Sequence, residues 1–305
     1  MKNTKPKVRL WSVLTGLTAI LTVAAIVGNI IANQYATTIN VALNASTYKI
    51  IHGKNTGDTE YFKKGFASDE EREAYEAELC ATVEAEGAAL LKNENNALPL
   101  ASGAKVSLFG HGSVDLMYGG TGSGSVDTSK APNLKQALEA QGITINQTLW
   151  DLYSSDSMMS KYSRMTPASI SDTLEANTQY AVNEAPWSAL SSAESSFAEY
   201  GDAAIVVLSR SGGEGADLPS GENGTSDSWI SGQEGDGNYL ALSAEEIELL
   251  QNLKALKDNG TFKNIVVLIN SSNAIELDFL NPEICGEDYG IDLSLIHISE
   301  PTRLD

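Results

Sequence analysis

A single carboxylate stands among glycines just after an apolar run in AAIVVLSRSGGEGADLP, residues 203–219. Glu214 lies between two glycines, and residues 203–209 have the continuous apolar character of a strand covered on both faces. Glycines allow backbone angles that could aim such an acid, and a general acid needs reach and a raised pKa. Taken alone, the pattern fits a solvated loop carboxylate best, with a general acid as the alternative.

A second glycine-rich loop, GGTGSG at residues 119–124, follows a predicted strand at residues 105–110. A dinucleotide-binding loop would turn directly from strand to helix and would have an acid about 20 residues later. Here several residues separate the strand from the glycines, and no acid follows the short apolar segment at residues 143–146. We therefore expect these glycines to let the backbone approach a ligand or a neighbouring domain, and we keep nucleotide binding as a minor alternative.

Composition excludes several classes of function. The 305-residue chain has a net charge of −20, which disfavours nucleic acid as a partner because its phosphates need basic residues. Its two cysteines, Cys80 and Cys285, lack metal-ligand spacing and form no disulfide framework, and with three histidines in the chain we expect no histidine-based metal site. Cys80 lies in a helical pattern and is interpreted as a small buried thiol.

The N-terminus has the pattern of a membrane anchor. Residues 1–9 are basic and residues 10–32 are apolar, which is long enough to cross a bilayer core of roughly 30 Å. Basic flanks stay cytoplasmic, so we expect a single-pass protein of the cell membrane whose remaining chain lies outside. A cleaved signal peptide and a buried soluble helix are the alternatives, and residues 33–67 are expected to form a stalk.

Strands and helices alternate in the remainder of the chain, which predicts a three-layer α/β/α sandwich with a mostly parallel sheet. Ligands on such sheets bind beyond the carboxyl ends of the strands, where the glycine-rich loops fall. The expected strands are residues 105–110, 143–146, 203–209 and 264–270, and the expected helices are residues 131–142, 188–201, 242–260 and 272–280.

Two helix starts have capping-box spacing, Ser68 to Glu71 and Ser243 to Glu246. We expect the first of these helices to run towards KNENNALPL, residues 92–100. Pro132 is expected near the first turn of the helix over residues 131–142. The buried face of the first helix is predicted to comprise Leu79, Val83, Leu90 and Leu91.

Several segments occur together in one order: EGAALLKNENNALPL, KVSLFGHG, MYGGTGSGSV, VVLSRSGGEGADLP and NIVVLINSSNAIEL, with NEAPWS at residues 183–188. Over residues 61–292 this set resembles the α/β sandwich domain of glycoside hydrolase family 3, the β-glucosidase family. The order of segments resembles a permuted bacterial subgroup in which the sandwich precedes a (β/α)8 barrel. An incomplete sandwich domain is therefore expected over residues 68–292.

The resemblance implies a retaining glycosidase without metal or organic cofactor, in which a barrel aspartate attacks and a sandwich-loop glutamate is the acid/base. The SGGEG sequence matches that acid/base position, so Glu214 is the implied catalytic residue. Arg210 and Asp217 flank it and are expected to position the loop or contact sugar. The implied substrate is a β-glucoside, with a β-xyloside or related oligosaccharide as the alternative. Expected lining residues of the cleft are Gly120, Thr121, Gly122 and Ser123.

The resemblance ends after YGID at residues 289–292. Residues 293–305 resemble translated sequencing-adapter sequence, so we expect an artefactual tail on an N-terminal fragment; a genuine divergent C-terminus is the alternative. No candidate for the barrel nucleophile occurs in the chain, which predicts that the fragment alone is inactive. The alternative function is a non-catalytic carbohydrate-binding or scaffold domain of the same fold.

Overall fold

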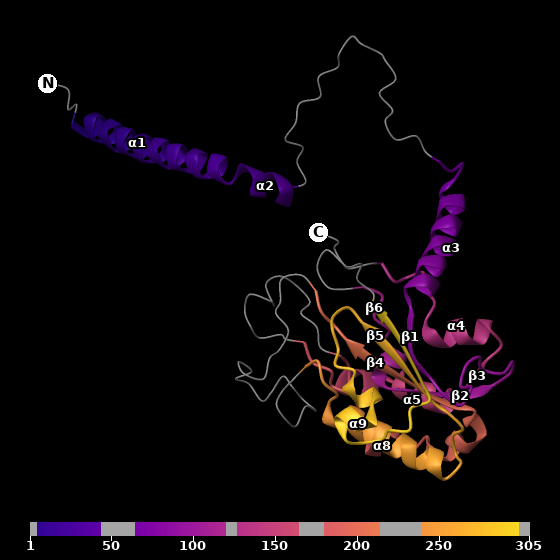
Figure 1. The fold of residues 1–305 in the computed structure, drawn as a ribbon. Helices are drawn as coiled ribbons and strands as arrows, with labels where there is room; N and C mark the ends of the chain where they lie inside the picture. Colours follow the sequence, from indigo (N-terminus) through magenta and orange to yellow (C-terminus); the bar gives the residue numbers. More distant parts are fainter. Residues whose placement is uncertain (1–4, 44–64, 120–126, 165–179, 214–238, 299–305) are drawn as a thin grey trace. The chain divides into compact units, whose positions relative to one another are not determined.

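The computed structural model describes residues 5–43, 65–119, 127–164, 180–213 and 239–298, in two units divided after Ala67 (Figure 1). The first unit contains α1 (Lys5–Gln34) and α2 (Ala36–Ala42). Within α1, Leu10–Gln34 is long and apolar enough to cross a membrane, with a mean hydropathy of 2.1 and no buried residues. This helix includes the whole apolar segment expected at residues 10–32.

A six-stranded sheet organises the second unit, in the order β1-β6-β5-β4-β2-β3. All neighbouring strands are parallel except β1 and β6, which are antiparallel. The expected mostly parallel sheet is therefore confirmed, with one antiparallel edge. The strands are β1 (Ala89–Asn93), β2 (Lys105–Phe109), β3 (Thr144–Ile145), β4 (Ala203–Arg210), β5 (Ile265–Ser271) and β6 (Leu293–Ile298).

Both faces of this sheet are covered, which confirms the expected sandwich. Alternate residues of β4 enter two different apolar clusters, because successive side chains of a strand point to opposite faces: Val206 packs in one and Ile205 in the other. The first cluster includes Leu149 of α5 (Gln147–Tyr153) and Leu250 of α8 (Ala244–Asp258). The second is covered by residues of α4 (Leu134–Ala140).

The other described helices are short, apart from α3. They are α3 (Asp69–Gly87), η1 (His111–Ser113), α6 (Asp156–Lys161), η3 (Trp187–Leu190), η4 (Glu194–Tyr200), η5 (Asp278–Leu280) and α9 (Pro282–Cys285). Two 3-10 helices thus occupy most of the segment expected as one helix at residues 188–201. In the segment expected as a helix at residues 272–280, only η5 is helical.

Helix caps account for the starts of α3, α8 and α4. The Ser243 hydroxyl accepts from the Glu246 N–H while the Glu246 carboxylate accepts from the Ser243 N–H, which confirms the second capping box. Ser68 caps α3 by accepting from the Glu71 N–H. On α4 the cap is Asn133, paired reciprocally with Gln136, so the helix begins at Leu134, three residues after the expected start at residue 131, and Pro132 lies just before the cap.

The prediction for the buried face of the helix that follows Ser68 was wrong. Helix α3 ends at Gly87 and has no buried residues, and Leu79 is 46% exposed. Leu90 and Leu91, expected on the same helix, lie on β1, because β1 pairs with β6 and draws these residues into the sheet. Cys80, expected to be buried, is exposed on α3.

The last described strand extends the sheet beyond the expected boundary at residue 292. Strand β6 pairs with β5 on one side and β1 on the other, and Leu293 and Ser294 are buried. The alternation of LSLIHI suits a strand in this position. The sheet domain therefore continues to Ile298, although the origin of residues 293–305 stays a prediction.

Candidate functional site

The carboxyl ends of β2 and β4 lie side by side, because the two strands are paired in parallel. Gly110, directly after β2, has φ 80°, and a Cβ atom there would lie 2.7 Å from the carbonyl oxygen of Val207 on β4. Only glycine suits this close approach and positive φ. The chain therefore turns into η1 tightly against β4, at the edge where ligands of parallel sheets bind.

Arg210, the last residue of β4, is fully buried. Its two terminal nitrogens donate to the two carboxylate oxygens of Glu246 at 2.8 and 2.7 Å. The remaining donors reach the carbonyls of Ser209, Tyr239 and Ala241. All five N–H donors of the guanidinium are thereby used within the protein. Of the two roles expected for Arg210, this arrangement favours positioning over contact with sugar.

Tyr239 is the first described residue after residue 213 in the chain, and its side chain binds the residue that follows Arg210. Its hydroxyl accepts from the Ser211 N–H at 2.9 Å and donates to the Ser211 carbonyl at 3.0 Å. The tyrosine is itself held, because Arg210 donates to its carbonyl oxygen at 2.8 Å. Burial raises the pKa of Tyr239 to about 12, so the hydroxyl keeps its proton and serves as both donor and acceptor.

The next residue, Gly212, is bound in the same way by Ser272, which follows β5. The Ser272 hydroxyl accepts from the Gly212 N–H at 2.8 Å and donates to its carbonyl at 3.0 Å. The side chain of Asn273 packs beside it, since a Cβ at Gly212 would lie 3.0 Å from the Cβ of Asn273. Two side-chain hydroxyls thus bind the backbone of two consecutive residues at the end of β4.

Beside β2, a buried acid joins the η1 turn to the segment at residues 180–186. The carboxylate of Glu184 accepts from the backbone N–H of His111 at 2.8 Å and of Ala185 at 2.9 Å. Burial raises the pKa of Glu184 to about 8 against the lowering effect of those donors. Burial, together with the positive charge of Arg164, lowers the pKa of His111 to about 3. At neutral pH both side chains are therefore uncharged.

Most of the site residues expected from sequence lie outside the described residues: Glu214, Asp217, Gly120, Thr121, Gly122 and Ser123. Arg210 lies among the described residues and precedes Glu214 by four positions in the sequence. The described residues include no group of three or more His, Cys, Asp or Glu side chains suited to a metal ion.

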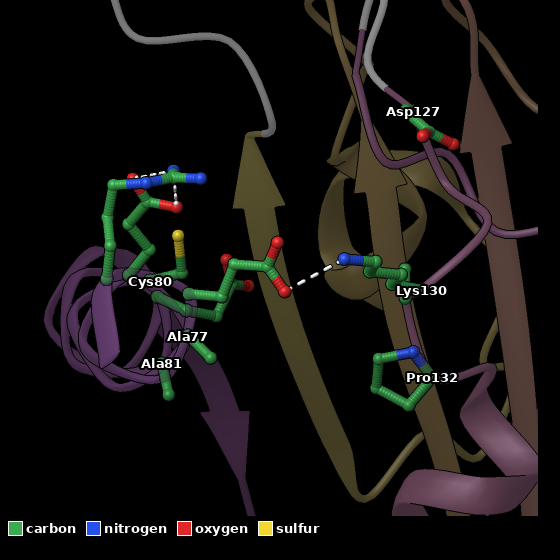
Figure 2. A pocket seen from close by; sticks show the side chains of 11 residues that line it. Ala77, Cys80, Ala81, Asp127, Lys130 and Pro132 are labelled. Carbon is green, nitrogen blue, oxygen red and sulfur yellow. Dashed lines mark hydrogen bonds and ion pairs between the residues drawn. The ribbon is translucent and has the colours of Figure 1, made fainter. Parts of the chain in front are cut away.

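A groove of about 1000 Å³ lies elsewhere, between α3 and residues 127–132 (Figure 2). Ala77 and Cys80 line its α3 side and Pro132 the opposite side. Glu73 and Lys130 meet across it at 2.8 Å, and this contact lowers the pKa of Glu73. None of the site residues expected from sequence lines this groove, and we assign it no part in the chemistry.

Sequence reasoning missed Tyr239, Ser272 and Glu184 as members of the site. Ser272 follows a predicted buried strand, so its place at the carboxyl edge was readable from the pattern. Tyr239 follows the glycine-rich segment in the sequence, but no motif around it indicates a role in the site. Glu184 stands in NEAPWS at residues 183–188, and nothing in that sequence indicates that its side chain is buried.

Comparison with known proteins gives one consistent result. Residues 88–286 match the family profile described as glycosyl hydrolase family 3 C-terminal domain. Beta-glucosidase A of Butyrivibrio fibrisolvens is 34% identical over 146 residues, which is 46% of this chain and 15% of that protein. The chain therefore spans a small part of the curated relative that it matches.

Solved structures share the fold. A β-glucosidase from Paenibacillus barengoltzii superposes with a TM-score of 0.52 at 24% identity, over 72% of this chain and 21% of that chain. β-Glucosidase 3B from Thermotoga neapolitana, solved in complex with glucose, gives a TM-score of 0.50 at 22% identity, over 74% of this chain and 27% of that chain.

Proposed function

The chain belongs to glycoside hydrolase family 3, and from this premise we propose that it supplies the general acid/base of a retaining, exo-acting β-glucosidase. The acid/base is Glu214, four residues beyond the end of β4. Its carboxyl group protonates the leaving glycosidic oxygen and then deprotonates the water that releases the sugar. A β-D-glucoside is the proposed substrate, supported by the relative named beta-glucosidase A.

One observation carries the proposal. The backbone immediately before Glu214 is bound at the carboxyl edge of the sheet by two buried hydroxyls, those of Tyr239 and Ser272. A loop that was merely solvated would need no such attachment. An acid that must act within roughly 5–5.5 Å of a nucleophile on another domain needs a defined starting point.

The proposal requires a second carboxylate from a barrel domain outside residues 1–305. The nucleophile attacks the anomeric carbon, and Glu214 acts from the opposite side of the cleft between the two domains. Metal ions and organic cofactors have no step in this reaction. Residues 120–123 and Asp217 are proposed to contact the sugar from the sandwich side.

Location follows from α1. We propose that Leu10–Gln34 anchors the protein in the cell membrane with the basic N-terminus inside and the sandwich outside. A glucosidase held there acts on oligosaccharides at the cell surface. Cleavage of the segment as a signal peptide would instead release the same domain, and N-terminal sequencing of the mature protein distinguishes the two.

Reading the source gene beyond codon 292 is the first test. A reading frame that continues into a barrel with a nucleophilic aspartate supports the proposal. A stop codon near residue 305 favours the non-catalytic carbohydrate-binding or scaffold domain. The 305-residue chain is expected to show no turnover of an aryl β-glucoside, and hydrolysis that disappears in Glu214→Gln would contradict the need for a barrel.

Kinetics of the full-length product then test the role of Glu214. Glu214→Gln should abolish hydrolysis of cellobiose, whose poor leaving group needs protonation. The variant should still release dinitrophenolate rapidly from 2,4-dinitrophenyl β-glucoside, because that leaving group departs without an acid. Azide should restore its turnover, since an anion needs no general base. Equal loss on both substrates, without rescue, would exclude the acid/base role.

A further inference from the structure

The backbone N–H and C=O groups of Ser211 and Gly212, just before Glu214 in the sequence, form hydrogen bonds with side chains instead of with neighbouring strands. In a parallel sheet, a strand residue normally exchanges hydrogen bonds with the backbone of its neighbours. At Ser211 and Gly212, each residue instead gives both its N–H and its C=O to one side-chain hydroxyl. Each hydroxyl therefore replaces a strand neighbour just beyond the end of β4.

We propose that Tyr239 and Ser272 are positioning residues that fix the backbone of Ser211 and Gly212 and so set where the acid/base Glu214 begins its reach. This inference rests on the function proposed above. It assigns the positioning to two hydroxyls from different parts of the chain, one before α8 and one after β5.

The two hydroxyls are well suited to this task. Both side chains are buried, at 1% exposure for Tyr239 and 7% for Ser272, so water does not compete easily for their partners. Tyr239 is further held by its neighbours: Arg210 donates to its carbonyl, and the guanidinium carbon lies 5.8 Å from the centre of its ring. A residue that positions a functional group must itself be held in place by packing and hydrogen bonds, as Tyr239 is.

Sterics confine the same backbone from a third side. Asn273 packs against Gly212 so closely that a Cβ at that position would lie 3.0 Å from the Cβ and 3.2 Å from Oδ1 of Asn273. The glycine therefore allows the chain to pass between Ser272 and Asn273. A side chain at residue 212 would require the Asn273 side chain or the backbone at Gly212 to shift.

Amide hydrogen exchange on the 305-residue chain tests the attachment itself. Tyr239→Phe and Ser272→Ala each remove one hydroxyl, which is worth about tenfold in the local opening equilibrium. We expect exchange in peptides covering residues 209–213 to accelerate by about that factor. Ser113→Ala is the matched control, because Ser113 is buried on η1 and its hydroxyl has no hydrogen-bond partner among the described residues.

Kinetics of the full-length product test the consequence for Glu214. A displaced acid should lower kcat/KM for cellobiose about tenfold more than for 2,4-dinitrophenyl β-glucoside, whereas general unfolding lowers both equally. Unchanged exchange and an unchanged ratio, as in Ser113→Ala, would overturn the inference. Accelerated exchange with an unchanged ratio would also overturn it, because the attachment would then be structural only.

Failure of the proposed function gives a different result. In that case Glu214→Gln itself would show no dependence on the leaving group, whatever the exchange data. The inference fails alone when Glu214→Gln shows that dependence and both hydroxyl variants do not.

Discussion

Arg210 and Glu246 form a buried pair in which each carboxylate oxygen accepts from a different terminal nitrogen of the guanidinium, at 2.8 and 2.7 Å. Glu246 is also the third residue of α8, whose side chain completes the capping box with Ser243. The pair therefore connects the start of α8 to the end of β4. Through the Nε donor of Arg210 it also binds the carbonyl oxygen of Tyr239.

Removal of either member of this buried ion pair should lower the free energy of unfolding substantially. Glu246→Ala leaves a buried guanidinium without its counter-charge, so we expect the free energy of unfolding to fall by about 3–5 kcal/mol. Glu199→Ala is the control, because its pair with Lys105 is exposed and such pairs contribute about 0–1 kcal/mol. Urea denaturation measures both, and a similar small loss in the two variants would contradict the structural role of the buried pair.

The protonation of Glu184 predicts a pH dependence of stability. Its pKa is raised from 4.5 to about 8 in the folded protein, mainly by burial. Between these values the folded state holds a proton that the unfolded state has released, so this group's stabilising contribution is full below pH 4.5 and is lost as pH rises through 8. Glu184→Gln cannot titrate. The stability of this variant relative to the wild type should therefore rise by roughly 4 kcal/mol from pH 4.5 to pH 8.5.

The measurement is the difference between the two proteins in urea denaturation at each pH, which cancels the titration of shared carboxyl groups. The offset at low pH is expected to be unfavourable to the variant, because a glutamine NH2 cannot accept one of the two backbone hydrogen bonds. A difference that stays constant with pH would show that Glu184 is ionised in the fold.

Alanine substitutions at two glycines distinguish the cost of backbone strain from the cost of a steric clash. Gly110 and Gly142 both have positive φ, 80° and 78°, but only Gly110 has an atom within 4 Å of an added Cβ, the Val207 oxygen at 2.7 Å. Gly142→Ala should therefore cost about 1–2 kcal/mol from φ alone. Gly110→Ala should cost roughly 3 kcal/mol or more, because the β2–β4 contact must also shift. Equal losses in thermal denaturation would remove the argument for close approach.

The position of β6 between β1 and β5 predicts what happens when the chain is shortened from its C-terminal end. The comparison is between the 305-residue chain and a chain that ends at residue 292. A chain that ends at residue 292 lacks the strand between β1 and β5, which leaves β1 unpaired and β5 as an open edge prone to association. Gel filtration and circular dichroism compare the two chains. Identical monomeric, folded behaviour would mean that residues 293–298 are dispensable to the sheet.

The sheet was predictable from sequence because its central strands are continuous apolar runs. Residues 203–209 and 264–270 correspond closely to β4 and β5, and Ser243 with Glu246 marked the start of α8. These signals are local, and packing on both faces agrees with them.

The errors came from contacts between distant segments. Leu90 and Leu91 continue a helical pattern, but pairing of β1 with β6, about 200 residues later in the chain, makes them part of a strand. The attachment by Tyr239 and Ser272 could not be predicted either. The sequence placed Ser272 after a buried strand, but only the folded chain brings its hydroxyl to Gly212 and that of Tyr239 to Ser211.

The pairing of β1 with β6 has a consequence for the order of folding. Ala89 at the start of β1 stands opposite Ile296 near the end of β6, about 200 residues later in the chain. A contact of such long range must close a long loop before it gains any stabilisation, so it forms late. We expect β1 to join the sheet after β2, β4 and β5 have paired.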